Sequence, residues 1–202
     1  YIYKSTNGVI TLKIAITGHT SGIGKALFNI LENRGHAMTG LSKRTGHNIR
    51  TIPKIAALVE PCDMFINNAQ AGYAQTELLY DVWQKWRNVP GKSIWCISTM
   101  MTQQPVDPPI PGQEEMAISQ YRTQKRALEE TVNQLRAKSG SCRIVIIRPG
   151  GVATLDGQEP DDRLCDVDKW ANLVIDTMAS ADAQGMQFTE LSLGRSSSVV
   201  GI

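Results

Sequence analysis

Tyr121 and Lys125 stand four residues apart in the polar stretch SQYRTQKRALEE (residues 119–130). If this stretch is helical, the two side chains lie on one face, close enough for a cation to act on a phenol. A free tyrosine titrates near ~10, which is too high for easy proton exchange at neutral pH. A neighbouring ammonium would lower that pKa, so the pair could transfer protons. A solvent-exposed helix can carry the same pair without any catalytic role. Whether this pair is catalytic therefore depends on the other motifs of the chain.

A glycine-rich turn, TGHTSGIG (17–24), follows the first apolar segment, LKIAIT (12–17). An amphipathic helical pattern begins at Gly22 and ends at Gly35. Glycines let a backbone approach a pyrophosphate, and a helix start adds free N–H groups and a positive dipole end. A turn of this kind can simply connect strand to helix, but its position between a buried strand and an amphipathic helix favours a nucleotide site.

The second expected strand, HAMTGLS (36–42), leads into Ser42-Lys43-Arg44. Binding of NAD usually places an Asp or Glu here, to hold the ribose 2′-hydroxyl. Two cations and a hydroxyl suit a 2′-phosphate instead. The sequence therefore favours NADP(H), with NAD(H) as the alternative cofactor, over the competing interpretation of a solvated basic turn.

Short β-rich segments alternate with helical patterns along the rest of the chain. Further strands are expected at 64–69, 93–98, 143–149 and near 186–193, and helices at about 114–138 and 168–178. This alternation indicates βαβ units and an α/β fold. We expect a single-domain, Rossmann-like, doubly wound parallel sheet in three αβα layers over residues 12–202. Residues 1–11 are expected to be an N-terminal flank, and the Pro-rich residues 102–113 one long functional loop.

The overall composition restricts the class of protein. The chain is 42% hydrophobic and 20% charged with a net charge of +2, which argues against disorder and gives no general case for nucleic-acid binding. Its four cysteines lie far apart without metal-ligand spacing, and no apolar stretch approaches the ~18 residues of a membrane span. We expect a cytoplasmic protein with no signal peptide and no metal, membrane or nucleic-acid partner.

Four motifs in order resemble those of the short-chain dehydrogenase/reductase family: TGHTSGIG, NNA at 67–69, Tyr121-x-x-x-Lys125, and PGGVAT at 149–154. The resemblance covers roughly residues 12 to 194. The cofactor-binding residues it implies are Gly18, Thr20, Ser21, Gly22, Ile23 and Gly24 at the pyrophosphate, Asn48 and Ile49 at the adenine, Asn68 and Ala69 at the adenosine ribose, and Pro149, Gly150, Val152 and Thr154 at the nicotinamide carboxamide. Ser42, Lys43 and Arg44 join this set through the 2′-phosphate, and Tyr121 and Lys125 join it at the nicotinamide.

The resemblance also implies a reaction. Tyr121 would be the general acid or base, and Lys125 would be its partner and would bind the nicotinamide ribose. A third group must hold the substrate oxygen as charge develops. Ser98 is our first candidate and Thr99 a close second, because both follow the strand before the tyrosine helix. The implied function is an NADP(H)-dependent oxidoreductase acting on a small-molecule carbonyl or secondary alcohol, assembled as a homodimer or homotetramer.

Several features depart from the family pattern. The chain between Asn68 and Ser98 is short, so we expect trimmed outer helices and find no clear counterpart of the family's relay asparagine. The interval from Ser98 to Tyr121 is long and resembles the extended branch that modifies sugar nucleotides. Two alternatives therefore stay open: an NAD(P)-dependent epimerase or dehydratase, and a non-catalytic NADP-sensing regulator, although such regulators typically lose the Tyr/Lys pair.

Overall fold

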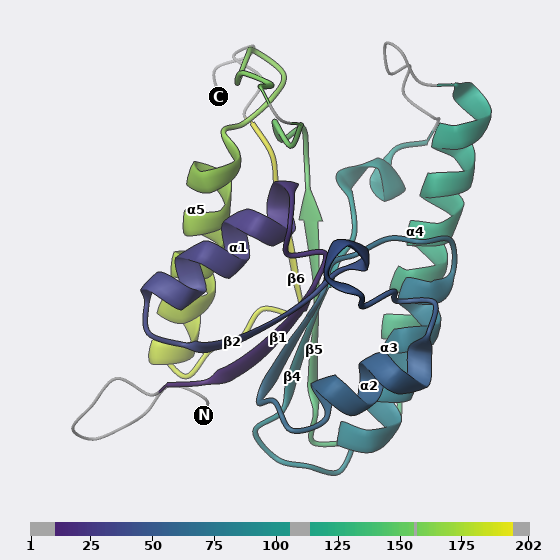
Figure 1. Cartoon of the computed structure of the whole chain (residues 1–202), viewed down its shortest axis with the longest axis vertical. Coiled ribbons are helices and arrows are strands. Elements are labelled where there is room, and N and C mark those ends of the chain that lie inside the picture. The colour runs from purple at the N-terminus through teal and green to yellow at the C-terminus, as the bar shows by residue number, and fades with distance from the viewer. Residues whose placement is uncertain (1–10, 106–113, 156, 196–202) are drawn as a thin grey trace.

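A six-stranded parallel sheet forms the centre of the molecule, in the order β2-β1-β3-β4-β5-β6 (Figure 1). The computed structural model describes residues 11–105, 114–155 and 157–195. The strands are β1 (Lys13–Thr17), β2 (Ala37–Leu41), β3 (Met64–Asn67), β4 (Ser93–Ile97), β5 (Arg143–Pro149) and β6 (Glu190–Leu193). The predicted α/β, doubly wound parallel architecture is confirmed.

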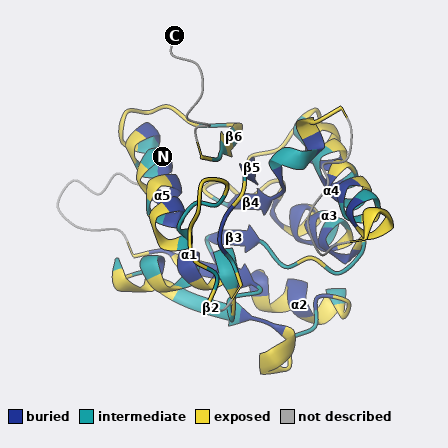
Figure 2. Cartoon of the chain, turned by 90° about the horizontal axis from the view of Figure 1, so that it is seen from above, coloured by how far each residue is buried: buried dark blue, intermediate teal, exposed yellow. Residues whose placement is uncertain are grey.

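Helices cover both faces of the sheet (Figure 1). Helices α1 (Gly22–Asn33) and α5 (Val167–Ala183) lie on one face, and α2 (Ile52–Val59), α3 (Ala74–Trp86) and α4 (Glu115–Arg136) on the other. The central strands therefore read as continuous apolar runs, because both their faces are buried. Figure 2 shows them as buried segments between two helical layers whose outer faces are exposed. Between Asn68 and Ser98, where trimmed helices were predicted, the structure has the single helix α3 of 13 residues.

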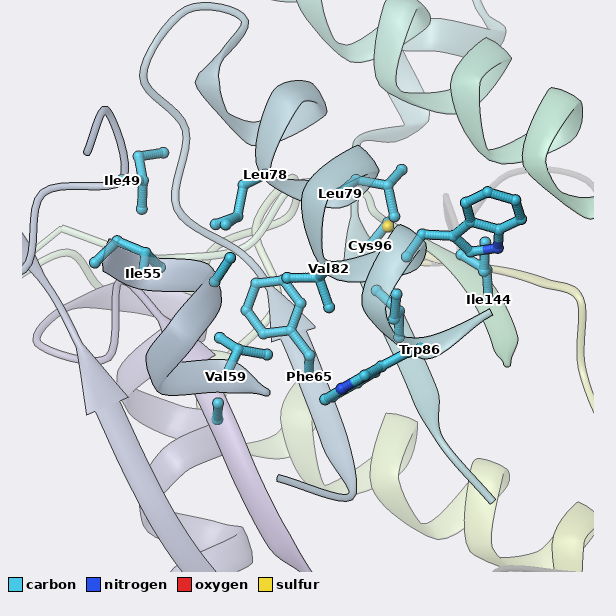
Figure 3. Close-up of a cluster of buried hydrophobic side chains, with 14 of the residues drawn as sticks. Ile49, Ile55, Val59, Phe65, Leu78, Leu79, Val82, Trp86, Cys96 and Ile144 are labelled. Atoms are coloured by element: carbon cyan, nitrogen blue, oxygen red, sulfur yellow. The ribbon is translucent and has the colours of Figure 1, made fainter. Parts of the chain in front are cut away.

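Two apolar cores lie between the sheet and these helices. In the core under α2 and α3, Phe65 of β3 lies among Val59, Val82 and Trp86 (Figure 3). Phe65 is completely buried and Trp86 nearly so. Burying a large apolar side chain contributes ~1.5–3 kcal/mol, so this core holds the sheet edge that carries the site firmly in place.

The strand order reverses between β1 and β3, which lie next to each other although β2 separates them in sequence. Ligands of such sheets bind beyond the carboxyl ends of the strands at this switch point. The loops after the two strands are tied together there. The Thr17 hydroxyl accepts hydrogen bonds from the N–H groups of Asn68 and Ala69, each at 3.0 Å. The Gly18 N–H donates to the Leu41 carbonyl of β2 at 2.7 Å, so three strand ends share one fixed junction.

Some element boundaries differ from the prediction. Helix α5 extends to Ala183, and Asp166 caps its start by accepting from the Lys169 N–H at 2.8 Å. The last strand pairs over Glu190–Leu193 and begins later than the predicted residue 186. The Pro-rich loop opens with a 3-10 turn, η2 (Met100–Gln103). The rest of that loop, 106–113, and the flank at 1–10 lie outside the described residues.

Helix α4 is long enough to cross a membrane but is mostly polar. Across the part of the chain that the structure describes, no helix combines the length and the apolar character of a membrane span.

Candidate active site

The glycine-rich turn adopts a shape that side chains would prevent. Gly18 and Gly22 have left-handed φ values of +75° and +51°. A Cβ on Gly24 would lie 2.2 Å from the Gly18 carbonyl oxygen, so the turn can close on α1 only without a side chain there. Ser21 is the extended N-cap of α1 and makes no side-chain capping bond. The first N–H groups of α1 are therefore left for an anion.

The two remaining predicted residues of this turn, Ile23 and Thr20, have different surroundings. The Ile23 side chain packs against the core beneath α1, so only its backbone can serve an anion. Thr20 lines a neighbouring cavity of about 310 Å³. This cavity lies beyond β1 and β2, where an adenosine is expected.

Most of the residues predicted for the adenosine end line this cavity. They are Ser42, Lys43, Arg44, Asn48, Ile49 and Ala69, and Gly18 and Thr20 of the predicted phosphate turn join them. His47, Gln70 and Ala71 also line it and were not predicted, although His47 and Gln70 each adjoin a predicted residue. Asn68 does not line the cavity, because its amide Nδ2 donates to the Thr17 carbonyl at 2.9 Å. Asn68 thus braces the junction between β1 and β3.

The basic turn at the cavity rim is well defined. The Ser42 hydroxyl accepts from the Thr45 N–H at 3.3 Å in a reciprocal capping box, and Gly46 closes the turn at φ +82°. Ser42 is therefore occupied in shaping the turn. Lys43 and Arg44 are exposed, and neither forms an ion pair with any residue that the structure describes. Their charge remains available to a ligand.

The segment after β5 folds back over the start of α1. A Cβ on Gly22 would lie 3.1 Å from the Thr154 side chain, and one on Gly150 would lie 2.8 Å from the Gly194 Cα. Val152 pairs with Cys165 through a β-bridge. A second cavity of about 390 Å³ lies between α1 and this segment, with Gly22 and Thr154 in its wall. The predicted nicotinamide segment, which begins at Pro149, is thus adjacent to the phosphate turn.

Helix α4 directs Tyr121 toward the end of β4. Burial raises the pKa of the Tyr121 phenol, and a hydrogen bond with the Thr99 side chain partly lowers it. The Lys125 ammonium lies 5.5 Å from the centre of the Tyr121 ring. The pKa of Tyr121 is therefore raised, not lowered as the sequence predicted, because burial outweighs the hydrogen bond with Thr99. The spacing does place both residues on one face, as predicted.

Lys125 is nearly completely buried, with 3% of its surface exposed. Its Nζ donates to the Gln75 Oε1 and to the Ile97 carbonyl oxygen, both at 2.8 Å. Removal from water disfavours the charged amine, so burial lowers the pKa of Lys125 to about 7. The nearby Glu129 carboxylate opposes this shift. Lys125 therefore sits close to the point where it can be charged or neutral at physiological pH.

Ser98 and Thr99 point to different partners. The buried Ser98 hydroxyl donates to the Glu129 carboxylate, which also accepts from Thr102 at 2.8 Å. Arg148 donates to both oxygens of this carboxylate, at 2.9 and 2.8 Å. Thr99 instead bonds with Tyr121. The structure thus brings the second candidate, Thr99, to the tyrosine and leaves Ser98 in a buried ionic cluster.

Gln75 is a site residue that the sequence reasoning missed. It is 2% exposed, lies in the first turn of α3 and contacts Lys125. A signal was available, because Gln75 is the polar member of a stripe that continues through Leu78, Leu79 and Val82. A polar residue on an otherwise apolar helix face needs a buried partner.

The Glu129–Arg148 pair is expected to stabilise this region strongly. Both side chains are largely buried, at 13% and 7% exposure. Arg148 also pairs with Glu190 at 2.7 Å, so it keeps one carboxylate partner when Glu129 is neutralised. Glu129→Gln therefore weakens charge-assisted hydrogen bonds without leaving an unpaired charge, and it should lower the free energy of unfolding by ~1.5–3 kcal/mol. Asp176→Asn, at the more exposed pair with Arg34, should change it by less than ~1 kcal/mol. Urea unfolding of both variants measures the difference, and equal losses would contradict the assignment.

No protein-family model and no curated protein sequence matches the chain. Solved structures do match it. A short-chain dehydrogenase from Burkholderia cenocepacia J2315 in complex with NADP superposes with a TM-score of 0.69 at 13% identity, over 93% of this chain and 90% of that one. The chain has the short-chain dehydrogenase/reductase fold.

Two further structures extend this likeness. A short-chain dehydrogenase/reductase from Vibrio parahaemolyticus gives a TM-score of 0.69 at 16% identity, over 90% of this chain and 99% of that one. The 3-alpha-hydroxysteroid dehydrogenase from Pseudomonas sp. B-0831, complexed with NADH, gives 0.64 at 18% identity, over 90% and 94%. Since nearly the whole of each neighbour is covered, the short-chain dehydrogenase/reductase fold is present here from β1 to β6.

Proposed function

We propose that the chain is a nicotinamide-dependent oxidoreductase of the short-chain dehydrogenase/reductase family, which interconverts a carbonyl and a secondary alcohol. One observation carries the proposal. Tyr121 and Lys125 share a face of α4, and the tyrosine hydroxyl bonds with Thr99 at the carboxyl end of β4. A phenol, an amine and a hydroxyl thus converge beside a glycine turn that fits a dinucleotide pyrophosphate.

The cofactor would lie across the carboxyl edge of the sheet. Its pyrophosphate fits the turn that Gly18, Gly22 and Gly24 shape, and its adenosine fits the cavity of about 310 Å³. The segment from Pro149 to Thr154 would hold the nicotinamide end. When bound, the nicotinamide accepts or supplies the hydride, which no side chain can do.

The side chains would handle the proton and the substrate oxygen. In carbonyl reduction Tyr121 gives its phenolic proton to the oxygen, and Thr99 stabilises the developing negative charge by donating a hydrogen bond. Lys125 stands behind the phenol, where its charged form favours the phenolate that remains. In alcohol oxidation the same groups act in reverse.

We further propose NADP(H) as the preferred cofactor. Lys43 and Arg44 supply two cations at the cavity rim that pair with no described residue, and the described lining of the cavity contains no carboxylate. A 2′-phosphate carries the charge that suits such a rim. The neighbours bind both forms, NADP in the Burkholderia protein and NADH in the Pseudomonas enzyme, so this preference rests on the chain's own residues.

The first test combines binding and turnover. The purified chain is titrated with NADPH and with NADH by fluorescence, and consumption of the tighter-binding cofactor is then followed with a panel of aldehydes and ketones. Binding followed by carbonyl-dependent consumption supports the proposal. If the chain binds neither cofactor, the enzyme assignment fails.

Thr99 and Ser98 predict different kinetic outcomes. Thr99→Ala removes the donor to the substrate oxygen and should lower kcat by ~10²–10³-fold, whereas Thr99→Ser should retain most activity. Ser98→Ala removes one of several bonds to Glu129 and should act mainly on stability. Steady-state kinetics and thermal unfolding of the three variants check this. A collapse of kcat in Ser98→Ala, with Thr99→Ala still active, would reverse the two roles.

A further inference from the structure

We propose that Gln75 is a positioning residue that orients Lys125 within the active site. The inference deepens the proposed function and rests on it. Gln75 lies fifty positions before Lys125 in the sequence, yet its carboxamide oxygen accepts a hydrogen bond from Nζ at 2.8 Å. Both residues are almost completely buried, so water does not compete for this contact.

The orientation of the Gln75 amide follows from its other bonds. The Nε2 group donates to the Asn67 carbonyl at 2.7 Å and to the Ile97 carbonyl at 3.1 Å. A carbonyl oxygen can only accept, so the NH₂ must face these two groups and Oε1 must face Lys125. Asn67 fixes the backbone in turn, because its Nδ2 donates to the Gln75 carbonyl at 2.9 Å. The acceptor presented to Lys125 is thereby locked.

This lock joins the ends of two strands. Asn67 is the last residue of β3 and Ile97 the last residue of β4. Gln75 therefore connects Lys125, which belongs to α4, to the ends of β3 and β4. These strand ends lie beside the cofactor turn and Thr99.

Two fixed bonds also determine the direction of the third Lys125 proton. An ammonium has three N–H donors in tetrahedral arrangement. The Gln75 oxygen and the Ile97 carbonyl accept two of them, and the third has no partner among the residues that the structure describes. We assign this third donor to the cofactor ribose. Without the Gln75 oxygen the amine could rotate, and small misplacements in an active site can cost ~10²-fold in rate.

Among the residues that the structure describes, the ionisable groups near Lys125 are Cys96 of β4 and Tyr121 and Glu129 of α4. Burial raises the pKa of Cys96 to about 12, so this thiol is uncharged at neutral pH. Burial also raises the pKa of Tyr121, which keeps the phenol neutral. Of these groups, only Glu129 carries a charge beside Lys125. A new carboxylate at position 75 would therefore raise the pKa of Lys125 markedly.

Two variants distinguish a role of Gln75 in positioning Lys125 from a purely structural role. Gln75→Met and Gln75→Glu both lose the NH₂ that donates to Asn67 and Ile97, so a purely structural role would weaken both. Only Gln75→Glu keeps an oxygen acceptor for Lys125, and its negative charge favours the ammonium. Gln84→Met, at an exposed position of the same helix, is the matched control.

The readouts are kcat, KM, the pH profile of kcat, and the titration of Lys125 itself. The titration is followed by NMR of lysine labelled with ¹³C at Cε, with Lys125→Arg to assign the signal. We expect Gln75→Met to lower kcat by ~10–10²-fold with a smaller change in KM, and to titrate Lys125 at lower pH. Gln75→Glu should titrate Lys125 at higher pH and retain more activity than Gln75→Met. Gln84→Met should match the wild type.

The outcomes are decisive in both directions. Opposite shifts of the Lys125 titration in the two variants support the assignment. If Gln75→Met does not fold, an upward shift in Gln75→Glu supports it, and the absence of a shift there overturns it. A working enzyme whose Lys125 titration and kcat are unmoved by either substitution overturns this inference alone. A wild-type chain that binds no dinucleotide and reduces no carbonyl overturns the proposed function, and this inference with it.

Discussion

Replacing Tyr121 by phenylalanine is expected to lower kcat by ~10²–10⁴-fold, the usual contribution of a general acid or base. The substitution removes only the hydroxyl that bonds with Thr99. The ring remains, and with it the packing of α4 and the contact with the Lys125 ammonium at 5.5 Å. The cofactor should therefore bind as tightly as in the wild type. Steady-state kinetics measure the first quantity and fluorescence titration with NADPH the second.

Tyr73→Phe is the matched control for this experiment. Tyr73 precedes α3 and is 50% exposed, so loss of its hydroxyl should leave kcat unchanged. Retention of full activity in Tyr121→Phe would mean that another group moves the proton. If the wild type binds NADPH tightly but shows no turnover, and Tyr121→Phe does not change its binding to a partner, the results would instead support the NADP-sensing regulator.

The features that the sequence predicts well are those that depend on neighbours along the chain. The glycine turn follows from local backbone geometry, since a Cβ on Gly24 would strike the Gly18 carbonyl. The shared face of Tyr121 and Lys125 follows from the helical period. The basic rim at Lys43 follows from its place directly after β2.

The features that it leaves open depend on partners far away in the sequence. Ser98 and Thr99 are adjacent, and successive side chains at a strand end point in opposite directions. Which of them faces Tyr121 depends on where Glu129 and Arg148 lie, and only the packed structure shows this. Burial of Tyr121 is likewise a tertiary property, which is why its pKa moves opposite to the direction that its spacing from Lys125 suggests.

The double substitution Lys43→Ala/Arg44→Ala is expected to weaken NADPH binding by ~10²-fold and to leave NADH binding almost unchanged. A charge-assisted hydrogen bond contributes ~1.5–3 kcal/mol, and the exposure of both side chains places them at the low end of this range. Since 1.4 kcal/mol corresponds to about tenfold in affinity, each cation accounts for about one factor of ten. Fluorescence titrations of wild type and variant with both cofactors measure the effect.

Salt and a control variant make this test specific. Interactions between exposed charges are screened over ~8 Å at physiological ionic strength, so the NADPH preference of the wild type should shrink as salt rises. The preference of the double variant should be small at every salt concentration. Lys54→Ala removes an exposed cation of α2 that does not line the cavity, so it should leave the preference intact. If Lys54→Ala loses as much of the NADPH preference, the preference comes from the overall positive charge and not from a specific site. A wild type that prefers NADH would refute the 2′-phosphate site and would leave the proposed role of Tyr121 unchanged.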